Sequence, residues 1–153
     1  AASDVYKRQI VKTIRKHSKN AVIVIGTPTW SQDVDVVAQS PLKGKNLMYA
    51  LHFYAGTHKE WNQEKLKTAH KKGLPVMVTE FSICDASGNG ALDKASGNQW
   101  LRLLDRYNIS YTAWSLCNKN ESSALIASTC SKTSGWTNGD LSAAGKWYFN
   151  KTK

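Results

Sequence analysis

Four short apolar runs alternate with segments of helical character along this chain of 153 residues, and this alternation constrains the fold more than any other feature. The runs are rich in β-branched and aromatic residues, which favour buried strands. We expect strands at 21–26, 47–54, 74–81 and 110–116, the first of them buried on both faces. The apolar spacing predicts helices at 10–17, 33–39, 60–72, 96–107 and 141–149. This order of strands and helices is typical of a parallel α/β fold.

Residues of unusual character gather where the expected strands end, as in TPTW at 27–30, HFY at 52–54 and TEF at 79–81. In a (β/α)₈ barrel the active site lies at these carboxyl ends of the strands. Such a barrel needs eight strands, whereas the chain offers four and has no internal repeat that would complete a smaller barrel. No G-x-G-x-x-G motif follows the first strand, so a dinucleotide-binding fold has little support.

The formal net charge is +10, but the basic residues are scattered over helix faces and the C-terminal tail. Because no RNP signature or zinc knuckle accompanies the charge, we expect a solvated surface and no nucleic-acid partner. No apolar run approaches the roughly 20 residues that span a bilayer, so we expect no membrane segment.

Three cysteines occur, without the C-x-x-C or Cys/His spacing that would predict a zinc site. Cys117 and Cys130 flank a loop and could pair, which would leave Cys84 free. The disulfide state and the redox compartment therefore stay open.

Glu80 is one of four glutamates and the only one that directly follows an apolar run. Glu60 and Glu64 have the spacing of a solvated helix face. An acid at the end of a buried strand stands at the rim of a barrel interior, and a buried carboxylate is costly unless it is paired or functional. Position alone leaves a catalytic role and a structural salt bridge open.

His52 and Tyr54 lie two residues apart in the second expected strand, so their side chains share one face. We expect this face to be the interior, close to Glu80, where the two side chains would orient the carboxylate and bind a sugar hydroxyl. The other histidines lie in helix or loop contexts, and we assign no role to them: His17, His58 and His70.

Several tryptophans sit beside polar residues in expected loops, namely Trp30, Trp114 and Trp136. Indole faces in such loops suit stacking on the apolar faces of sugars, while the alternative for each is a partly buried packing residue. The chain continues after Trp114 with Asn118, Lys119 and Glu121. Lys and Glu beside a stacking Trp can bind vicinal hydroxyls of a pyranose; the alternative is an ordinary ion pair in an exposed loop.

Four segments together resemble glycoside hydrolase family 5, in particular its bacterial endo-β-1,4-glucanases. They are IVIGTPTWSQDVD, LMYALHFYAGTH, LPVMVTEFS and AWSLCNKNESSA, in the order of the family. One such motif is a weak signal, whereas four in order with suitable spacing are specific. The resemblance runs from about residue 10 to the C-terminus. It implies the C-terminal half of a (β/α)₈ TIM barrel, with strands five to eight and their helices.

The resemblance implies a retaining cellulase that acts on a β-glucan polysaccharide or oligosaccharide without any cofactor. Glu80 matches the family nucleophile, and His52 and Tyr54 match the pair that ends the sixth strand. The remaining matches are substrate-binding residues: Trp114 on the floor of the cleft, Lys119 and Glu121 on the non-reducing side, and Trp30 on the leaving-group side. Relatives cut cellulose, mixed-linkage glucan, xyloglucan or mannan, so the exact specificity stays open.

The chain departs from the family pattern at the general acid/base. The family carries this glutamate in an Asn-Glu-Pro motif at the end of the fourth strand, and the sequence has no such motif. Retaining hydrolysis needs two carboxyl groups about 5–5.5 Å apart. We therefore expect the chain to be inactive alone and to need the missing N-terminal half. A non-catalytic carbohydrate-binding half-barrel is the alternative.

Residues 1–9, AASDVYKRQ, lack a cap motif and do not blend into the helix that follows. We expect them to be a non-native or junction segment, with residues 10–153 forming the C-terminal half of a glycoside hydrolase catalytic domain. The resemblance implies a secreted enzyme whose signal peptide belongs to the missing N-terminal region.

Overall fold

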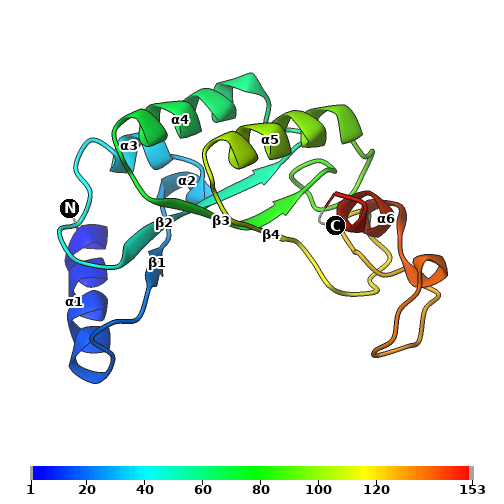
Figure 1. The fold of residues 1–153 in the computed structure, drawn as a ribbon, viewed down its shortest axis with the longest axis horizontal. Helices are drawn as coiled ribbons and strands as arrows, with labels where there is room; N and C mark the ends of the chain where they lie inside the picture. The colour runs from blue at the N-terminus through cyan, green and yellow to red at the C-terminus, as the bar shows by residue number, and fades with distance from the viewer. Residues whose placement is uncertain (1, 152–153) are drawn as a thin grey trace. The chain divides into compact units, whose positions relative to one another are not determined.

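The computed structural model describes residues 2–151 and contains a four-stranded sheet with the order β1-β2-β3-β4 (Figure 1). Its strands are β1 (Ile23–Ile25), β2 (Leu47–Tyr54), β3 (Val76–Ser82) and β4 (Tyr111–Ala113). β1 pairs in parallel with β2, and β3 pairs in parallel with β4. The prediction of an α/β fold with a parallel sheet is confirmed.

The helices follow the strands largely as predicted. They are α1 (Ala2–His17), α2 (Pro28–Ser31), α3 (Val34–Val37), α4 (Glu60–Lys71), α5 (Lys94–Arg106) and α6 (Ala143–Phe149), with a short 3₁₀ helix, η1, at Asn138–Asp140. Helix α1 begins at Ala2 and therefore runs through most of the expected junction segment, whose origin stays a prediction. None of the helices described is long and apolar enough to cross a membrane.

The first strand differs from its prediction. It has three residues, and Ile25 is buried while Val22 and Val24 are exposed, so the expectation of burial on both faces is wrong. A continuous apolar run does not reveal which of its faces will be covered. The fourth strand is also shorter than predicted, because regular pairing ends at Ala113.

The chain divides into two compact units. The first comprises the residues up to Leu51 together with Glu64–Met77, and the second comprises His52–Gln63 together with the residues from Val78 onward. In the first unit, Leu47, Tyr49, Ala50 and Leu51 of β2 are buried, as are Leu66 and Ala69 of α4. A side-chain bond ties α1 to the loop before β2, since Arg15 Nη2 donates to the Lys45 carbonyl at 2.7 Å.

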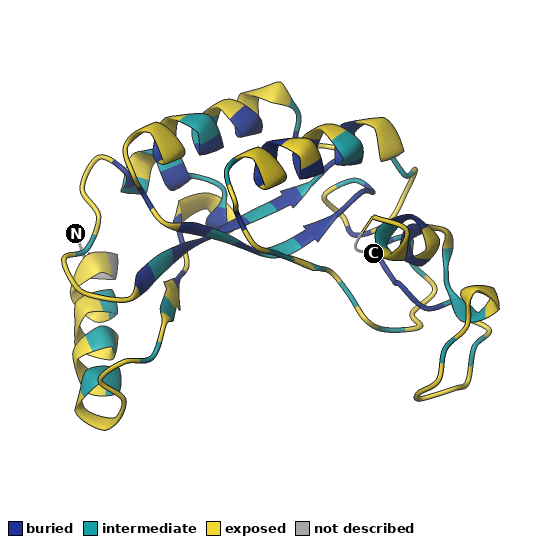
Figure 2. Cartoon of the chain, in the orientation of Figure 1, coloured by how far each residue is buried: buried dark blue, intermediate teal, exposed yellow. Residues whose placement is uncertain are grey.

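The core of the second unit is a stack of three aromatic rings. Phe53 of β2 lies parallel to Trp100 of α5 with ring centroids 4.0 Å apart, and Phe81 of β3 lies 5.1 Å from Phe53. Helix α5 carries its buried residues on the side that faces these strands and exposes the other (Figure 2). Because neighbouring residues in a strand point to opposite faces, His52 and Tyr54 are turned away from this core.

Candidate active site

A bulge in β3 brings two consecutive residues to the same side of the sheet. Val78 pairs with Tyr111 and Phe81 pairs with Ala113, so three steps along β3 match two along β4. Such a bulge inserts one extra residue and re-aims the side chains next to it. Phe81 thereby joins the aromatic core, while Thr79 and Glu80 both reach the side chains of β2 on the opposite face.

The Glu80 carboxylate is held by two side chains of β2. The Tyr54 hydroxyl donates to Glu80 Oε1 at 2.7 Å, and His52 Nδ1 lies 3.6 Å from Oε2. About a quarter of each of the His52 and Glu80 side chains is exposed, so the cluster is partly screened from water but open to a ligand. Its three members come from the same unit and lie close together, as the sequence led us to expect of His52, Tyr54 and Glu80.

Burial is the main cause of the pKa shifts in this cluster. It raises the pKa of the Tyr54 phenol, and the hydrogen bond to Glu80 and the charge of Glu80 raise it further. Tyr54 therefore remains a protonated donor at neutral pH. Burial also lowers the pKa of His52, and the negative charge of Glu80 only partly opposes this shift. His52 is accordingly neutral at neutral pH.

His58 has a structural role that the sequence analysis did not assign. It is only 5% exposed, and its Nδ1 accepts a hydrogen bond of 2.8 Å from the backbone N–H of Tyr54. Its own carbonyl accepts a bond from the Trp100 indole, also at 2.8 Å. His58 thus fixes the end of β2 at the residue that contacts Glu80. The spacing of four residues between Tyr54 and His58 was the only signal of this contact.

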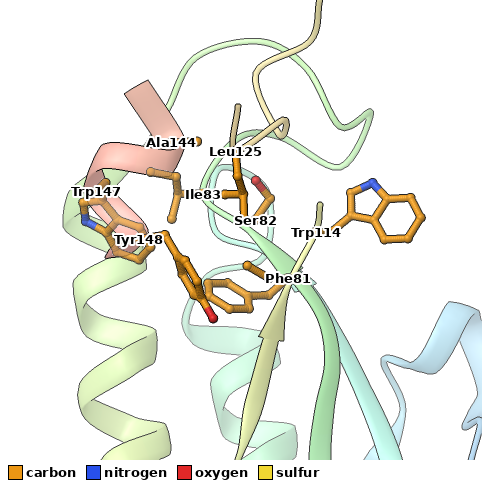
Figure 3. Close-up of a pocket in the computed structure, with 9 residues that line it drawn as sticks. Phe81, Ser82, Ile83, Trp114, Leu125, Ala144, Trp147 and Tyr148 are labelled. Atoms are coloured by element: carbon orange, nitrogen blue, oxygen red, sulfur yellow. The ribbon is translucent and has the colours of Figure 1, made fainter. Parts of the chain in front are cut away.

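Trp114 directs its indole away from the core of the second unit. Figure 3 shows Phe81, Trp147 and Tyr148 packed on one side of the end of β4, with the Trp114 ring projecting from the other. The cavity among these side chains is about 10 Å³, which is about enough for one water and far too small for a sugar. With 44% of Trp114 exposed, its ring is available for stacking rather than committed to packing.

Lys119 and Glu121 form a loose ion pair in the loop after β4, with 4.0 Å between Nζ and Oε1. The hydroxyl of buried Ser123 donates to the same oxygen of Glu121 at 3.3 Å and steadies it. Both members of the pair line a polar hollow of about 340 Å³. Asn118 lies outside this group, because its amide bonds the Cys130 carbonyl at 2.9 Å.

Trp30 belongs to the first unit and is 86% exposed. The backbone around it adopts the left-handed conformation at three successive residues, with φ of 54° at Thr29, 50° at Trp30 and 62° at Ser31. This conformation is uncommon outside glycine, so the segment that exposes the indole is strained.

The expected helix at 33–39 is reduced to the single turn α3.

All three cysteines are free in the structure, so the pairing of Cys117 with Cys130 that the sequence left open is not formed. Among the residues described, no group of three or more His, Cys, Asp or Glu side chains has an arrangement that could hold a metal ion.

Comparison with known proteins decides the family. The sequence model of the family described as Cellulase (glycosyl hydrolase family 5) matches residues 2–120. The chain belongs to this family. An endoglucanase of Clostridium saccharobutylicum is 44% identical over 140 residues, which are 92% of this chain and 31% of that protein. Endoglucanase 5 of Pectobacterium carotovorum is 39% identical over 142 residues, 93% of this chain and 28% of that protein.

Solved structures of family 5 proteins agree with the fold. A protein from Cytophaga hutchinsonii superposes with a TM-score of 0.93 at 36% identity, over 97% of this chain and 48% of the other. A variant of the endoglucanase catalytic domain of Thermobifida fusca, solved in complex with cellotetraose, gives a TM-score of 0.89 at 30% identity, over 96% of this chain and 50% of the other. The chain thus spans about half of these solved structures and about a third of the curated relatives.

Proposed function

We propose that the chain is the part of a retaining endo-β-1,4-glucanase that carries the nucleophile, Glu80. The observation that supports this best is the 2.7 Å hydrogen bond from Tyr54 to the Glu80 carboxylate, at the carboxyl end of a parallel strand in a family 5 chain. Polar residues at this position of a barrel strand are typical of an active site.

The proposed mechanism is double displacement. Glu80 attacks the anomeric carbon through an oxocarbenium-like transition state, and a second carboxyl group protonates the departing glucan oxygen. That second group then activates a water molecule, which hydrolyses the glycosyl-enzyme intermediate and releases the sugar from Glu80. Tyr54 occupies one oxygen of Glu80 and leaves Oε2, on the side of His52, for the attack.

We further propose that the chain corresponds to strands five to eight of a (β/α)₈ barrel, and that an N-terminal half supplies the acid/base. Coverage of about half of the matched structures supports this assignment. None of the other three glutamates ends a strand, because Glu60 and Glu64 lie in α4 and Glu121 lies in the loop after β4. The chain alone should therefore not turn over substrate. A separate part of the proposal is that the whole enzyme is secreted.

The substrate we propose is a β-1,4-glucan. The cellotetraose in the complex of a family 5 relative supports this choice, as do the exposed indole of Trp114 and the polar hollow beside Lys119 and Glu121. Trp30 would extend the binding surface on the leaving-group side.

Complementation tests the proposal. The chain is joined to, or mixed with, the N-terminal half of a family 5 endoglucanase that carries the Asn-Glu-Pro glutamate, and hydrolysis of carboxymethylcellulose is measured. We expect activity from the pair and none from either half. Glu80→Gln should abolish this activity, whereas Glu60→Gln, which changes an exposed glutamate of α4, should leave it intact. Equal activity of the wild type and Glu80→Gln would refute the nucleophile assignment.

A non-catalytic carbohydrate-binding module is the second candidate, and the exposure of Trp114 favours it as well. Under this alternative the chain binds cellotetraose, yet no complemented form hydrolyses carboxymethylcellulose. Calorimetric titration of the chain with cellotetraose, combined with the assay above, separates the two candidates.

A further inference from the structure

Thr79 brings to the Glu80 cluster a hydroxyl group that the proposed reaction does not use. Its Oγ1 lies 2.8 Å from Nε2 of His52, while the other ring nitrogen, Nδ1, lies 3.6 Å from Oε2 of Glu80. The imidazole therefore stands between a hydroxyl group and a carboxylate, and each of its nitrogens faces one of them.

The two neighbours are unequal partners for a neutral imidazole. A neutral imidazole has one N–H and one bare nitrogen, whereas a carboxylate can only accept and a threonine hydroxyl can donate or accept. If Nε2 carried the proton, the bare Nδ1 would present its lone pair to the negative oxygen of Glu80. If Nδ1 carries it, the N–H points toward Glu80, and the Thr79 hydroxyl donates to the bare Nε2. Only the second arrangement suits both neighbours.

We propose that Thr79 is a positioning residue for the nucleophile: its hydroxyl donates to His52 Nε2 and thereby holds the Nδ1–H of His52 toward Glu80. The inference rests on the proposed function, in that it takes Glu80 to be the ionised nucleophile. Thr79 acts through His52, since the hydrogen bond of its side chain goes to the His52 ring.

The local structure favours this role. Alternation from buried Val78 places Thr79 on the face of His52, and the bulge between Val78 and Phe81 brings the next residue, Glu80, to the same face. Threonine is β-branched and has few rotamers, so its hydroxyl is held in direction at little entropic cost. Serine would offer the same donor with more freedom, and valine would keep the shape without the donor.

The test reads the protonation of the His52 ring directly in the whole chain. With ¹⁵N-labelled histidine, long-range ¹H–¹⁵N correlation spectra at about pH 8, where an unperturbed imidazole is neutral, distinguish the protonated ring nitrogen from the bare one. The chain has four histidines, and a His52→Gln variant identifies the signals of His52 by their loss. Thr79→Val, Thr79→Ser and the wild type are compared, with Thr112→Val as a matched loss of a hydroxyl from the neighbouring strand β4.

We expect His52 to be protonated at Nδ1 and bare at Nε2 in the wild type, in Thr79→Ser and in Thr112→Val. In Thr79→Val we expect signals of both tautomers. Protonation at Nε2 in the wild type would overturn the proposal, and this readout needs no variant of Thr79 to fold. The proposal is equally overturned if Thr79→Val keeps the wild-type tautomer.

The spectra separate this inference from the proposed function, since they require no turnover. In the complemented enzyme, Thr79→Val should lower kcat by about five- to tenfold, the scale of one neutral hydrogen bond, with KM nearly unchanged. If Glu80→Gln stayed active while the Nδ1 tautomer was found, the nucleophile assignment would fail and the role of Thr79 in orienting His52 would stand. If His52 was protonated at Nε2 while Glu80→Gln was inactive, the role of Thr79 would fail and the nucleophile assignment would stand.

Discussion

The hydroxyl of Tyr54 donates to Glu80 Oε1 at 2.7 Å, and this bond joins the carboxyl ends of β2 and β3. The hydrogen bond has two consequences that can be measured separately. It fixes one rotamer of the carboxylate that approaches the anomeric carbon in the proposed mechanism, and, together with burial, it raises the pKa of the phenol and keeps it protonated.

Tyr54→Phe removes this bond and leaves the ring in place. We expect kcat of the complemented enzyme to fall by about tenfold, and the free energy of unfolding to fall by about 1 kcal/mol, because one partly buried hydrogen bond is lost. Steady-state kinetics and thermal unfolding measure the two effects. Tyr6→Phe is the control, since Tyr6 is an exposed residue of α1, and it should change neither quantity. An unchanged kcat in Tyr54→Phe would show that the bond does not orient the nucleophile.

The pKa of His52 makes stability depend on pH. Burial lowers this pKa below its ordinary value of 6.5, so the unfolded chain takes up the proton first as the pH falls. The stability contributed by the neutral ring is therefore present above about pH 6.5 and is lost as the pH falls through the folded pKa. We expect the Tm of the wild type to drop more steeply in this window than that of His52→Gln. Parallel curves for the two proteins would contradict the shift.

Regular packing explains why much of the fold could be predicted. The bounds of β2 were predicted as the structure has them, because LMYALHFY is a long run of apolar and aromatic residues interrupted only by His52. Helix α4 ends within one residue of the prediction, since Gly73 follows it. At Val22 and Val24 the same reasoning was wrong, because an apolar run does not say whether neighbouring structure covers both of its faces.

The geometry of the candidate site depends on irregular features that a sequence pattern does not predict. Simple alternation from buried Val76 and Val78 would place Glu80 on the helix-covered face, and the bulge reverses this. The placement of Glu80 beside His52 and Tyr54 could be predicted from its position at the end of a strand. The bulge itself could not be predicted, because nothing in the sequence between Val78 and Phe81 marks the extra residue. The left-handed backbone at Trp30 could not be predicted from the sequence either, because none of the residues that adopt it is a glycine.

Trp114→Ala should weaken the binding of cellotetraose. The indole is exposed and turned from the core, so its loss removes a stacking surface with little effect on the fold. We expect a loss of about 1 kcal/mol of binding free energy, or about fivefold in Kd, measured by calorimetry. Leu116→Ala, which truncates another exposed apolar side chain two residues further on, should leave Kd unchanged. An equal loss in both variants would argue against a specific stacking role.

His58 should matter more to stability than its place in a loop suggests. His58→Ala leaves the N–H of Tyr54 without its acceptor and opens a cavity where the buried ring lay beside Trp61, so we expect a loss of about 2–4 kcal/mol in the free energy of unfolding. His58→Asn offers an oxygen in place of Nδ1 and should recover part of the loss. Denaturant unfolding measures both. If Asn were no better than Ala, the hydrogen bond to Tyr54 would not be the reason for the burial of His58.

The exposed valines of the first unit predict self-association of the isolated chain. Val22 and Val24 lie in or next to β1, which is an edge strand of the sheet, and unpaired edges with apolar side chains favour pairing with other chains. We expect the chain to form dimers or larger species as its concentration rises, measured by light scattering after size exclusion. Val24→Thr, which keeps the shape and the β-branch, should shift association to higher concentration, whereas Val5→Thr on exposed α1 should not. A wild-type chain that stays monomeric and melts sharply at all concentrations would show that the exposed strand is tolerated.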